Sequence, residues 1–437
     1  MMALRGLFWI TVYVAVVMAP LVAASLTGGT PPRSWITEFS AALGFLALVI
    51  FGLQFALVAR FERVSAPFGM DALIQYHRQI AFVALAFALA HPVLLFIEDP
   101  SKMRLLWFPT APNRARCAAG ATVALLLVAG LSVFRKRLGL RYETWQLTHG
   151  LLATALIALS LAHAVGVGFY TGRLWPWILW VAISLALMAL LGWVRLVKPL
   201  LRLRRPWRVE EVRAERGNAW TLVLSPVGHD GFRFQPGQFG WVIVGRSPFA
   251  LTQHPFSFSS SAADAGRVAF TIKARGDFTS TVRSVAVGTR AYIEGPYGMF
   301  TMGRHEGPGF VLVAGGVGIT PLISMVRTMA DRSDARPVTL VYGNRDWESV
   351  TFREDLESLA TRMTLKVVHV LEKPHDGWTG ERGYITADLL RRHLPEGRER
   401  MRYFVCGPPP MMDALEQSLV AVGVPDGHVV TERFEMV

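Results

Sequence analysis

Four histidines lie within long apolar stretches of the chain, and their spacing repeats. His77 and His91 share one stretch, His149 and His163 share another, and each pair is 14 residues apart. Fourteen residues of an α-helix fall about 40° short of four full turns and rise about 21 Å. Each stretch therefore carries two imidazoles on one face, near opposite surfaces of a bilayer, where an ionisable side chain indicates function.

Imidazole is a common ligand of haem iron. Because both stretches are expected to cross the membrane in the same direction, His77 should face His149 at one level and His91 should face His163 at the other. This arrangement predicts two stacked haems with both axial positions filled, which pass electrons and bind no substrate. Interhelical hydrogen bonding is the plainer alternative. Zinc is disfavoured, since histidines 14 residues apart cannot share one ion.

The histidines need a membrane domain to hold them, and the first 200 residues provide one. Six apolar stretches are each long enough to cross about 30 Å of hydrocarbon as a helix. They lie near residues 4–26, 36–59, 71–97, 116–134, 141–166 and 174–195. The first also has features of a signal peptide, but it is longer than a usual signal core, so we expect it to be retained. A six-helix transmembrane bundle is predicted.

Composition agrees with a membrane protein. The chain has 437 residues, of which 52% are hydrophobic, which is high for a soluble chain of this size. Its net charge of +13 does not indicate a nucleic-acid partner, because the basic residues gather at the ends of apolar runs. Their excess on one side predicts that both termini are cytoplasmic. Two cysteines, Cys117 and Cys406, are too few for a disulfide framework or a Cys-rich metal site.

The second half of the chain changes pattern twice. Short alternating runs separated by Gly, Pro and Asp predict an antiparallel β-barrel, and from residue 310 strands, a glycine loop and helices alternate as in a parallel α/β sheet. We therefore predict a transmembrane domain over residues 1–200, a β-barrel domain over 201–305 and an α/β domain over 306–437. The histidines assign the first domain to two haems, and motifs within the other two assign the second to FAD and the third to NADPH.

Two segments of the barrel have side chains that suit a flavin. A hydroxyl on the first segment can hydrogen-bond the flavin ring, and the lysine and backbone amides of the second can hold a pyrophosphate. A hydroxyl-rich edge strand followed by a turn explains the same residues without a ligand. The predicted flavin-binding residues are His254, Pro255, Phe256, Ser257, Lys273, Gly276, Thr279 and Ser280.

A glycine loop after the strand at 310–314 predicts a phosphate site. Gly315, Gly316 and Gly318 precede a helical run, so free backbone N–H groups face a phosphate at a helix N-terminus. Thr320 is expected to be the helix N-cap, with Pro321 in the first helical position. The loop is not a strict dinucleotide fingerprint, and a purely structural turn is the alternative.

Two later strand ends extend the nucleotide site. Arg345 follows the next strand, where an arginine favours the 2′-phosphate of NADPH, although the adjacent Asp346 keeps NADH possible. Cys406, Gly407 and Pro408 form a turn whose thiol can lie beside a nicotinamide, while a buried cysteine also serves as apolar filler.

Taken together, these motifs resemble the NADPH oxidase and ferric reductase superfamily in its prokaryotic form, over nearly the whole chain. The resemblance rests on both His-x13-His pairs, His254-Pro-Phe-Ser257, Gly276-Asp-Phe-Thr279, Gly295-Pro-Tyr-Gly298, Gly315-Gly-Val-Gly-Ile-Thr-Pro321, Cys406-Gly-Pro-Pro-Pro-Met411 and Glu432-Arg-Phe434. It implies FAD, two b-type haems and hydride donation by NADPH, with Cys406 and Phe434 as catalytic residues. Phe434 would stack on the flavin.

The resemblance also implies a function. Electrons would leave a bacterial cytoplasmic membrane for O2, giving superoxide. A ferric or cupric chelate reductase and an electron-transfer module for a periplasmic protein are the alternatives, since each needs only an exposed outer haem. The chain departs from the animal oxidases in its spacing of 14 on the fifth helix and in three residues after Phe434. It has no calcium-binding loop or cytosolic partner motif, so no cytosolic regulators are expected.

Overall fold

We analysed a computed structural model of the chain. It describes residues 2–26, 33–245, 247–250 and 253–433. The chain divides into two compact units, Met1–Lys198 and Pro199–Val437, and each is described by itself. The domain limits near residues 200 and 305 stay predictions.

The first unit is a bundle of long helices. Among the residues that the structure describes, six helices are long and apolar enough to cross a membrane, which confirms the predicted six-helix region. The helices are α1 (Met2–Ser25), α2 (Trp35–Leu57), α4 (Met70–Glu98), α5 (Asn113–Val133), α6 (Tyr142–Val167) and α7 (Leu174–Gly192), followed by a π-helical turn, Trp193–Val197, and α8 (Lys198–Leu203).

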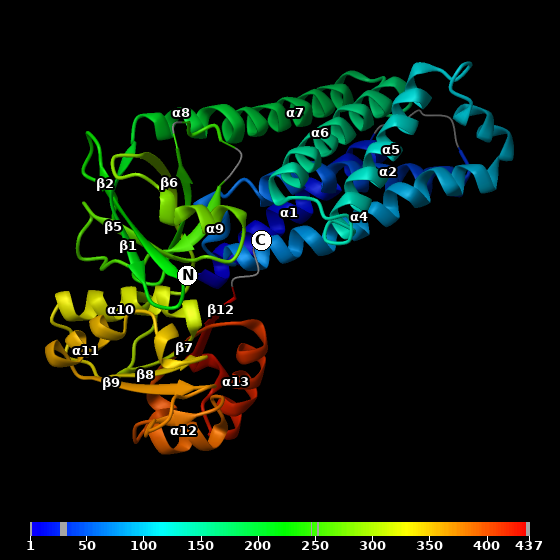
Figure 1. The fold of residues 1–437 in the computed structure, drawn as a ribbon. Helices are drawn as coiled ribbons and strands as arrows, with labels where there is room; N and C mark the ends of the chain where they lie inside the picture. Colours follow the sequence, from blue (N-terminus) through cyan, green and yellow to red (C-terminus); the bar gives the residue numbers. More distant parts are fainter. Residues whose placement is uncertain (1, 27–32, 246, 251–252, 434–437) are drawn as a thin grey trace. The chain divides into compact units, whose positions relative to one another are not determined.

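Within this bundle, α2 packs along α4 and α5 packs along α6 (Figure 1). Glycines permit the close approach. A Cβ at Gly44 of α2 would lie 3.3 Å from the His91 ring, and one at Gly166 of α6 would lie 3.1 Å from Arg114 Cβ. The two helices that carry the histidines, α4 and α6, are therefore each packed closely against the long helix that precedes them in the chain, α2 and α5 respectively.

The first sheet of the second unit is a curled antiparallel sheet in the order β4-β3-β6-β1-β2-β5. Its strands are β1 (Trp207–Glu215), β2 (Ala219–Pro226), β3 (Phe239–Val244), β4 (His254–Ser257), β5 (Val268–Lys273) and β6 (Arg290–Tyr297). Phe258, just after β4, forms a bridge with Phe270 of β5 and so joins the two edges. Both phenylalanines are fully buried, and the predicted barrel is confirmed.

The second sheet of this unit is parallel, in the order β10-β9-β8-β7-β11-β12. Helices α10 and α11 cover one face, and α12 and α13 cover the other (Figure 1). The elements are β7 (Phe310–Gly315), α10 (Ile319–Asp331), β8 (Val338–Asn344), α11 (Arg353–Arg362), β9 (Leu365–Leu371), β10 (Glu381–Arg382), α12 (Ala387–His393), β11 (Arg402–Cys406), α13 (Pro409–Ala421) and β12 (Val429–Glu432).

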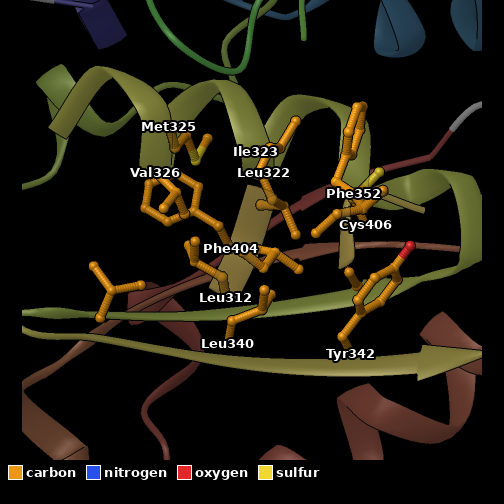
Figure 2. Close-up of a cluster of buried hydrophobic side chains, with 14 of the residues drawn as sticks. Leu312, Leu322, Ile323, Met325, Val326, Leu340, Tyr342, Phe352, Phe404 and Cys406 are labelled. Carbon is orange, nitrogen blue, oxygen red and sulfur yellow. The ribbon is translucent and has the colours of Figure 1, made fainter. Parts of the chain in front are cut away.

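The core of this α/β fold is built from alternating strand residues. Leu312, Leu340 and Phe404 point toward α10 (Figure 2). Val311 and Val341 belong to the cluster on the α12 and α13 face. Because both faces are covered, the strands are apolar throughout, as expected for a buried parallel sheet.

One local prediction was wrong. Thr320 is not the N-cap of α10, because the helix begins at Ile319 and Gly318 is the capping residue. The Thr320 hydroxyl donates instead to the Val317 carbonyl, at 3.0 Å. A single 3₁₀ turn, Gly316–Gly318, runs directly into the helix, so no extended residue remains for a hydroxyl cap.

Candidate functional site

The structure brings the four membrane histidines together in the two predicted pairs. The ring centroids of His77 and His149 are 6.4 Å apart, and those of His91 and His163 are 6.2 Å apart. A metal–imidazole bond of about 2 Å places the metal about 3 Å from the ring centroid. Two axial imidazoles on one metal therefore have centroids about 6 Å apart. Both pairs fit this requirement.

Three of the four imidazoles are held at Nδ1 by oxygen on a neighbouring helix. His91 Nδ1 lies 2.8 Å from the Ser40 carbonyl, and His163 Nδ1 lies 2.9 Å from the Arg114 carbonyl. Because a carbonyl can only accept, both nitrogens carry the proton and donate it. His149 Nδ1 lies 3.1 Å from Ser132 Oγ. With Nδ1 engaged, Nε2 is the nitrogen available for a metal.

The ligand arrangement differs from that of a compact metal site. Among the residues that the structure describes, no group of three or more His, Cys, Asp and Glu side chains gathers to hold one ion. A tetrahedral zinc site uses four clustered ligands. Two opposed imidazoles at each level suit a planar, four-coordinate metal complex bound between them.

Strand β4 carries the first predicted flavin segment. Ser257 is 4% exposed, and its Oγ has no hydrogen-bond partner among the described residues. Buried hydroxyls are nearly always hydrogen-bonded, so an orphaned one indicates a missing ligand. On the same strand, the His254 ring stacks on the Phe278 ring, with centroids 3.9 Å apart and an interplanar angle of 15°. The Phe256 ring also lies nearly parallel to Phe278. Pro255 separates His254 from Phe256 along the strand and pairs with β3.

The second flavin segment begins where β5 ends. Lys273 is the last residue of the strand, and burial, with the nearby Arg275, lowers the pKa of its ammonium. Gly276 caps the short helix α9 (Asp277–Thr281), which contains Ser280. The Thr279 hydroxyl accepts from the amides of Arg275 and Gly276, at 2.9 and 2.8 Å. These two amides are therefore already bonded, and the Ser280 amide donates to the Gly276 carbonyl at 3.0 Å, so pyrophosphate binding by the amides of this segment stays a prediction.

The glycine loop and the Cys406 turn lie together at the carboxyl ends of β7 and β11. These adjacent parallel strands flank the point where strand order reverses, which is where open α/β sheets bind ligands. A Cβ at Gly318 would lie 2.3 Å from the Cys406 carbonyl, and one at Gly407 would lie 2.4 Å from Met411 Cε. Only glycine allows this approach.

Gly316 differs from the other loop glycines. Its φ is +52°, and a Cβ there would meet nothing within 4 Å. The open space lies over a loop that also holds Gly315, whose Cβ would lie 2.5 Å from Met411 Sδ. Pro408 Cδ lies 2.8 Å from the same point. The loop is thus packed on one side and accessible above Gly316, as a phosphate cradle requires.

The roles predicted for two other residues, Cys406 and Phe434, stay predictions. Cys406 is fully buried beside Phe352 in the core (Figure 2), so contact between its thiol and a nicotinamide stays a prediction. Phe434 lies outside the described residues, and its stacking role also stays a prediction.

The end of β8 carries the predicted nucleotide-selecting residues. Arg345 is exposed, whereas the Asp346 carboxylate accepts from the Ser349 amide at 2.9 Å and caps a short 3₁₀ turn. Asn344 is 8% exposed, and its side chain interacts with the buried Tyr342 hydroxyl. The acidic residue is thus engaged, and the exposed arginine remains for a ligand.

Residues 43–160 match the family described as "Ferric reductase like transmembrane component". Residues 209–301 match an FAD-binding domain, and residues 312–417 match an oxidoreductase NAD-binding domain. The chain therefore has the fused architecture of a ferric reductase-like transmembrane segment followed by a ferredoxin–NADP reductase-type dehydrogenase. This ferric reductase-like protein is a multi-pass membrane oxidoreductase that uses NAD(P)H and FAD.

The ferric reductase-like chain is also similar to curated reductases. It is 29% identical over 199 residues to NADH-cytochrome b5 reductase 1 of Candida glabrata, covering 45% of this chain and 70% of that protein. It is 30% identical over 210 residues to NADH–cytochrome b5 reductase 1 of Arabidopsis thaliana, covering 46% and 71%. It spans about half of several others, such as the 54% covered in Pyricularia oryzae.

A solved structure described as the ferredoxin reductase in carbazole 1,9a-dioxygenase aligns with 53% of this chain and 69% of its own, at 25% identity and a TM-score of 0.47.

Sequence reasoning missed the residues that support the histidines. Ser132 and Ser40 belong to no motif, and their contacts depend on how α5 meets α6 and α2 meets α4. A polar residue on the inner face of a membrane helix was the available signal. Phe278 lies within the quoted Gly276-Asp-Phe-Thr279 motif, but its stacking on His254 was not foreseen.

Proposed function

We propose that this protein moves electrons from cytoplasmic NADPH through FAD and two b-type haems to O2 on the far side of the membrane, producing superoxide. The observation that carries the proposal is the pair of imidazole separations, 6.4 and 6.2 Å, on two helices that cross the membrane. With four turns of helix between the levels, the two metal positions are about 21 Å apart along the axis. They divide the bilayer into two transfer steps.

The bound cofactors supply the redox chemistry, since flavin accepts a hydride and can give up single electrons, and haem iron carries one electron at a time. The protein residues position them. Ser257 offers a buried hydroxyl to the flavin ring, and the open face above Gly316 offers backbone amides to the nucleotide phosphates. His77 and His149 hold one haem, and His91 and His163 hold the other. Because each haem would be held by two imidazoles, it would supply single electrons to O2 rather than bind it.

The preference for NADPH rests on Arg345 and Asp346. An exposed arginine suits the 2′-phosphate, and the neighbouring carboxylate is already used as a helix cap. The relatives named NADH-cytochrome b5 reductase use NADH by their name, so NADH is the competing donor to be measured.

The loop after α4 makes an anionic metal chelate the competing acceptor. Arg116 donates to the carbonyls of Phe108 and Pro109, each at 3.0 Å. These carbonyls are neutral, so the guanidinium keeps its positive charge and, with Arg104 and Arg114, would attract an anionic chelate. A neutral acceptor such as O2 needs no such attraction, and reoxidation by air or by ferric citrate separates the two.

The orientation is part of the proposal. Arg60 and Arg135 follow the second and fourth spans, and Arg195 follows α7 near the end of the sixth, and the positive-inside rule assigns these ends to the cytoplasm. The protein then lies in a bacterial cytoplasmic membrane, with its dehydrogenase domains and both termini inside. His77 and His149 form the cytoplasmic-level pair, and His91 and His163 form the outer pair.

The test uses the purified full-length protein with FAD and NADPH, first without oxygen and then in air. We expect b-type haem bands to reduce anaerobically and to reoxidise in air, with cytochrome c reduction that superoxide dismutase inhibits. Slow reoxidation by air but immediate reoxidation by ferric citrate would instead identify a metal-chelate reductase. Haems that reduce but reoxidise with neither would point to a periplasmic protein acceptor.

A further inference from the structure

The hydroxyl of Ser132, near the end of α5, contacts three groups at once. It donates to the Val128 carbonyl one turn earlier at 2.6 Å, lies 3.1 Å from His149 Nδ1, and lies 3.3 Å from Trp145 Nε1. Both the histidine and the tryptophan are on α6. This hydroxyl is therefore a polar junction between the two helices, inside the membrane bundle.

The chemistry of the junction fixes where each proton lies. A serine hydroxyl has one proton to donate and two lone pairs to accept with. The proton goes to the Val128 carbonyl, which can only accept and is the nearest of the three groups. The indole N–H of Trp145 can only donate. Ser132 Oγ must then accept from both α6 groups, so His149 carries its proton on Nδ1 and presents the Nε2 lone pair.

We propose that Ser132 and Trp145 are positioning residues that set the tautomer and the donor strength of His149 toward the cytoplasmic-level haem. The inference rests on the proposed function, because it requires iron at Nε2. A hydrogen bond donated from Nδ1 makes an imidazole a stronger electron donor to its metal. A stronger donor stabilises ferric over ferrous iron and so lowers the reduction potential of that haem.

The support of His149 differs from the other two because the Ser132 side chain alone provides it. His91 Nδ1 lies 2.9 Å from the Ser40 hydroxyl and 2.8 Å from the Ser40 carbonyl, and His163 Nδ1 lies 2.9 Å from the Arg114 carbonyl, so both keep a backbone acceptor after any side-chain substitution. For His77, the neighbouring backbone is that of Gln54, and no described group makes a well-formed hydrogen bond to its Nδ1. A change at Ser132 should therefore alter one haem and leave the other as it was.

Trp145 adds a second, opposite influence. Its ring lies 5.2 Å from the His149 ring, and its N–H competes for the same hydroxyl oxygen. Removing that N–H makes the oxygen a better acceptor for the histidine. Trp145→Phe keeps an aromatic ring in place and removes only this donor, so its effect on the potential should have the opposite sign to that of Ser132→Ala.

The bundle contains its own controls. Ser184 on α7 makes the same bond to the carbonyl four residues earlier, at 2.8 Å to Trp180, and contacts no histidine. Thr122 and Thr154 make this bond with a threonine hydroxyl, at 3.0 and 2.8 Å. Ser184→Ala therefore matches Ser132→Ala in the local helix change, and Ser132→Thr should retain the junction.

The experiment is a mediated spectroelectrochemical titration of the full-length protein in detergent, with low-temperature EPR and haem content. In Ser132→Ala we expect one of two midpoint potentials to rise, its low-spin ferric g-values to change, and affinity for that haem to fall about 10-fold. Trp145→Phe should move the same potential downward, and Ser132→Thr and Ser184→Ala should leave both potentials unchanged.

The outcomes separate this inference from the proposed function. A wild-type protein without haem bands would overturn the proposed function. A wild-type protein with two bis-imidazole haems, whose potentials and g-values are the same in Ser132→Ala and in Trp145→Phe, would overturn the positioning role alone. If Ser132→Ala does not assemble, an upward shift in Trp145→Phe would also contradict the proposed proton arrangement.

Discussion

His91 on α4 and His163 on α6 face each other with their ring centroids 6.2 Å apart. Each donates its Nδ1 proton to a backbone carbonyl of a different neighbouring helix, at 2.8 and 2.9 Å. The two rings are therefore oriented by the fold itself before any metal binds. Such preorganisation lowers the entropy that a bound group must offset on binding.

Ser257→Ala should weaken FAD binding without harming the apoprotein. The hydroxyl is buried and unpartnered in the described structure, so its loss removes a hydrogen bond only when the flavin is bound. One hydrogen bond of about 1–1.5 kcal/mol corresponds to a roughly 10-fold rise in Kd. Flavin fluorescence titration measures this.

Ser259→Ala is the matched control. Ser259 is fully buried on the same segment, but its hydroxyl accepts from Thr271 at 2.9 Å. That substitution should lower thermal stability and leave FAD affinity nearly unchanged. If both variants behave alike, the Ser257 hydroxyl does not face the flavin.

Arg345→Ala should raise the KM for NADPH about 10-fold or more and change the KM for NADH little. A charged hydrogen bond to the 2′-phosphate contributes about 1.5–3 kcal/mol, and NADH lacks that group. Steady-state kinetics with both donors measure the ratio. Arg391→Ala, on α12, is the control because it pairs with Asp388. Equal losses with the two donors would remove Arg345 from nucleotide selection.

Gly316→Ala should impair nucleotide binding more than it impairs stability. The added methyl would occupy the open space above the loop, and its positive φ costs an alanine about 1–2 kcal/mol. Gly423, after α13, also has a positive φ and open surroundings. Gly423→Ala should show the same stability cost in thermal unfolding but normal kinetics with NADPH. Similar kinetics in both variants would show that phosphate does not approach Gly316.

His369 should make the α/β domain sensitive to mild acid. Burial, with the nearby Arg353, lowers the pKa of its imidazole from 6.5 to about 4. Between these values the unfolded chain binds more protons than the folded one, so stability is complete above pH 6.5 and falls as the pH drops toward 4. Hydrogen exchange of the β9 peptides at pH 7 and pH 5 measures this. In His369→Gln the difference between the two pH values should shrink, and an unchanged difference would assign it to other groups.

Elements that depend on the hydropathy and length of long stretches of sequence could be predicted. The six spans follow from length and hydropathy, and the glycine loop follows from a strand and a helix on either side. The start of α10 could not, because a 3₁₀ turn replaced the expected cap and the Thr320 hydroxyl bonded back to Val317. Capping rules consider only whether a nearby hydroxyl can cap the helix. Here the close packing of Gly318 against the Cys406 backbone fixed the turn instead.

The candidate site was predictable in its ligands and not in its supports. The equal spacing of His77 from His91 and of His149 from His163 predicts facing pairs, since a helix repeats its faces regularly. Ser132 and Ser40 meet histidines only because helices approach at particular heights and rotations. The relative height and rotation of two helices cannot be predicted from a single sequence. The hydrogen bonds that orient the imidazoles therefore appeared only in the structure.

The most direct test of the account is the haem content of full-length His91→Ala and His149→Ala variants, measured by pyridine haemochrome against protein. The account predicts two haems per chain in the wild type and one in each variant, with the remaining haem still low-spin and bis-imidazole by EPR. His428→Ala, in the α/β domain, should retain both. Wild-type haem content in the two membrane variants, or no haem in the wild type, would contradict the central claim that these four histidines hold the redox centres.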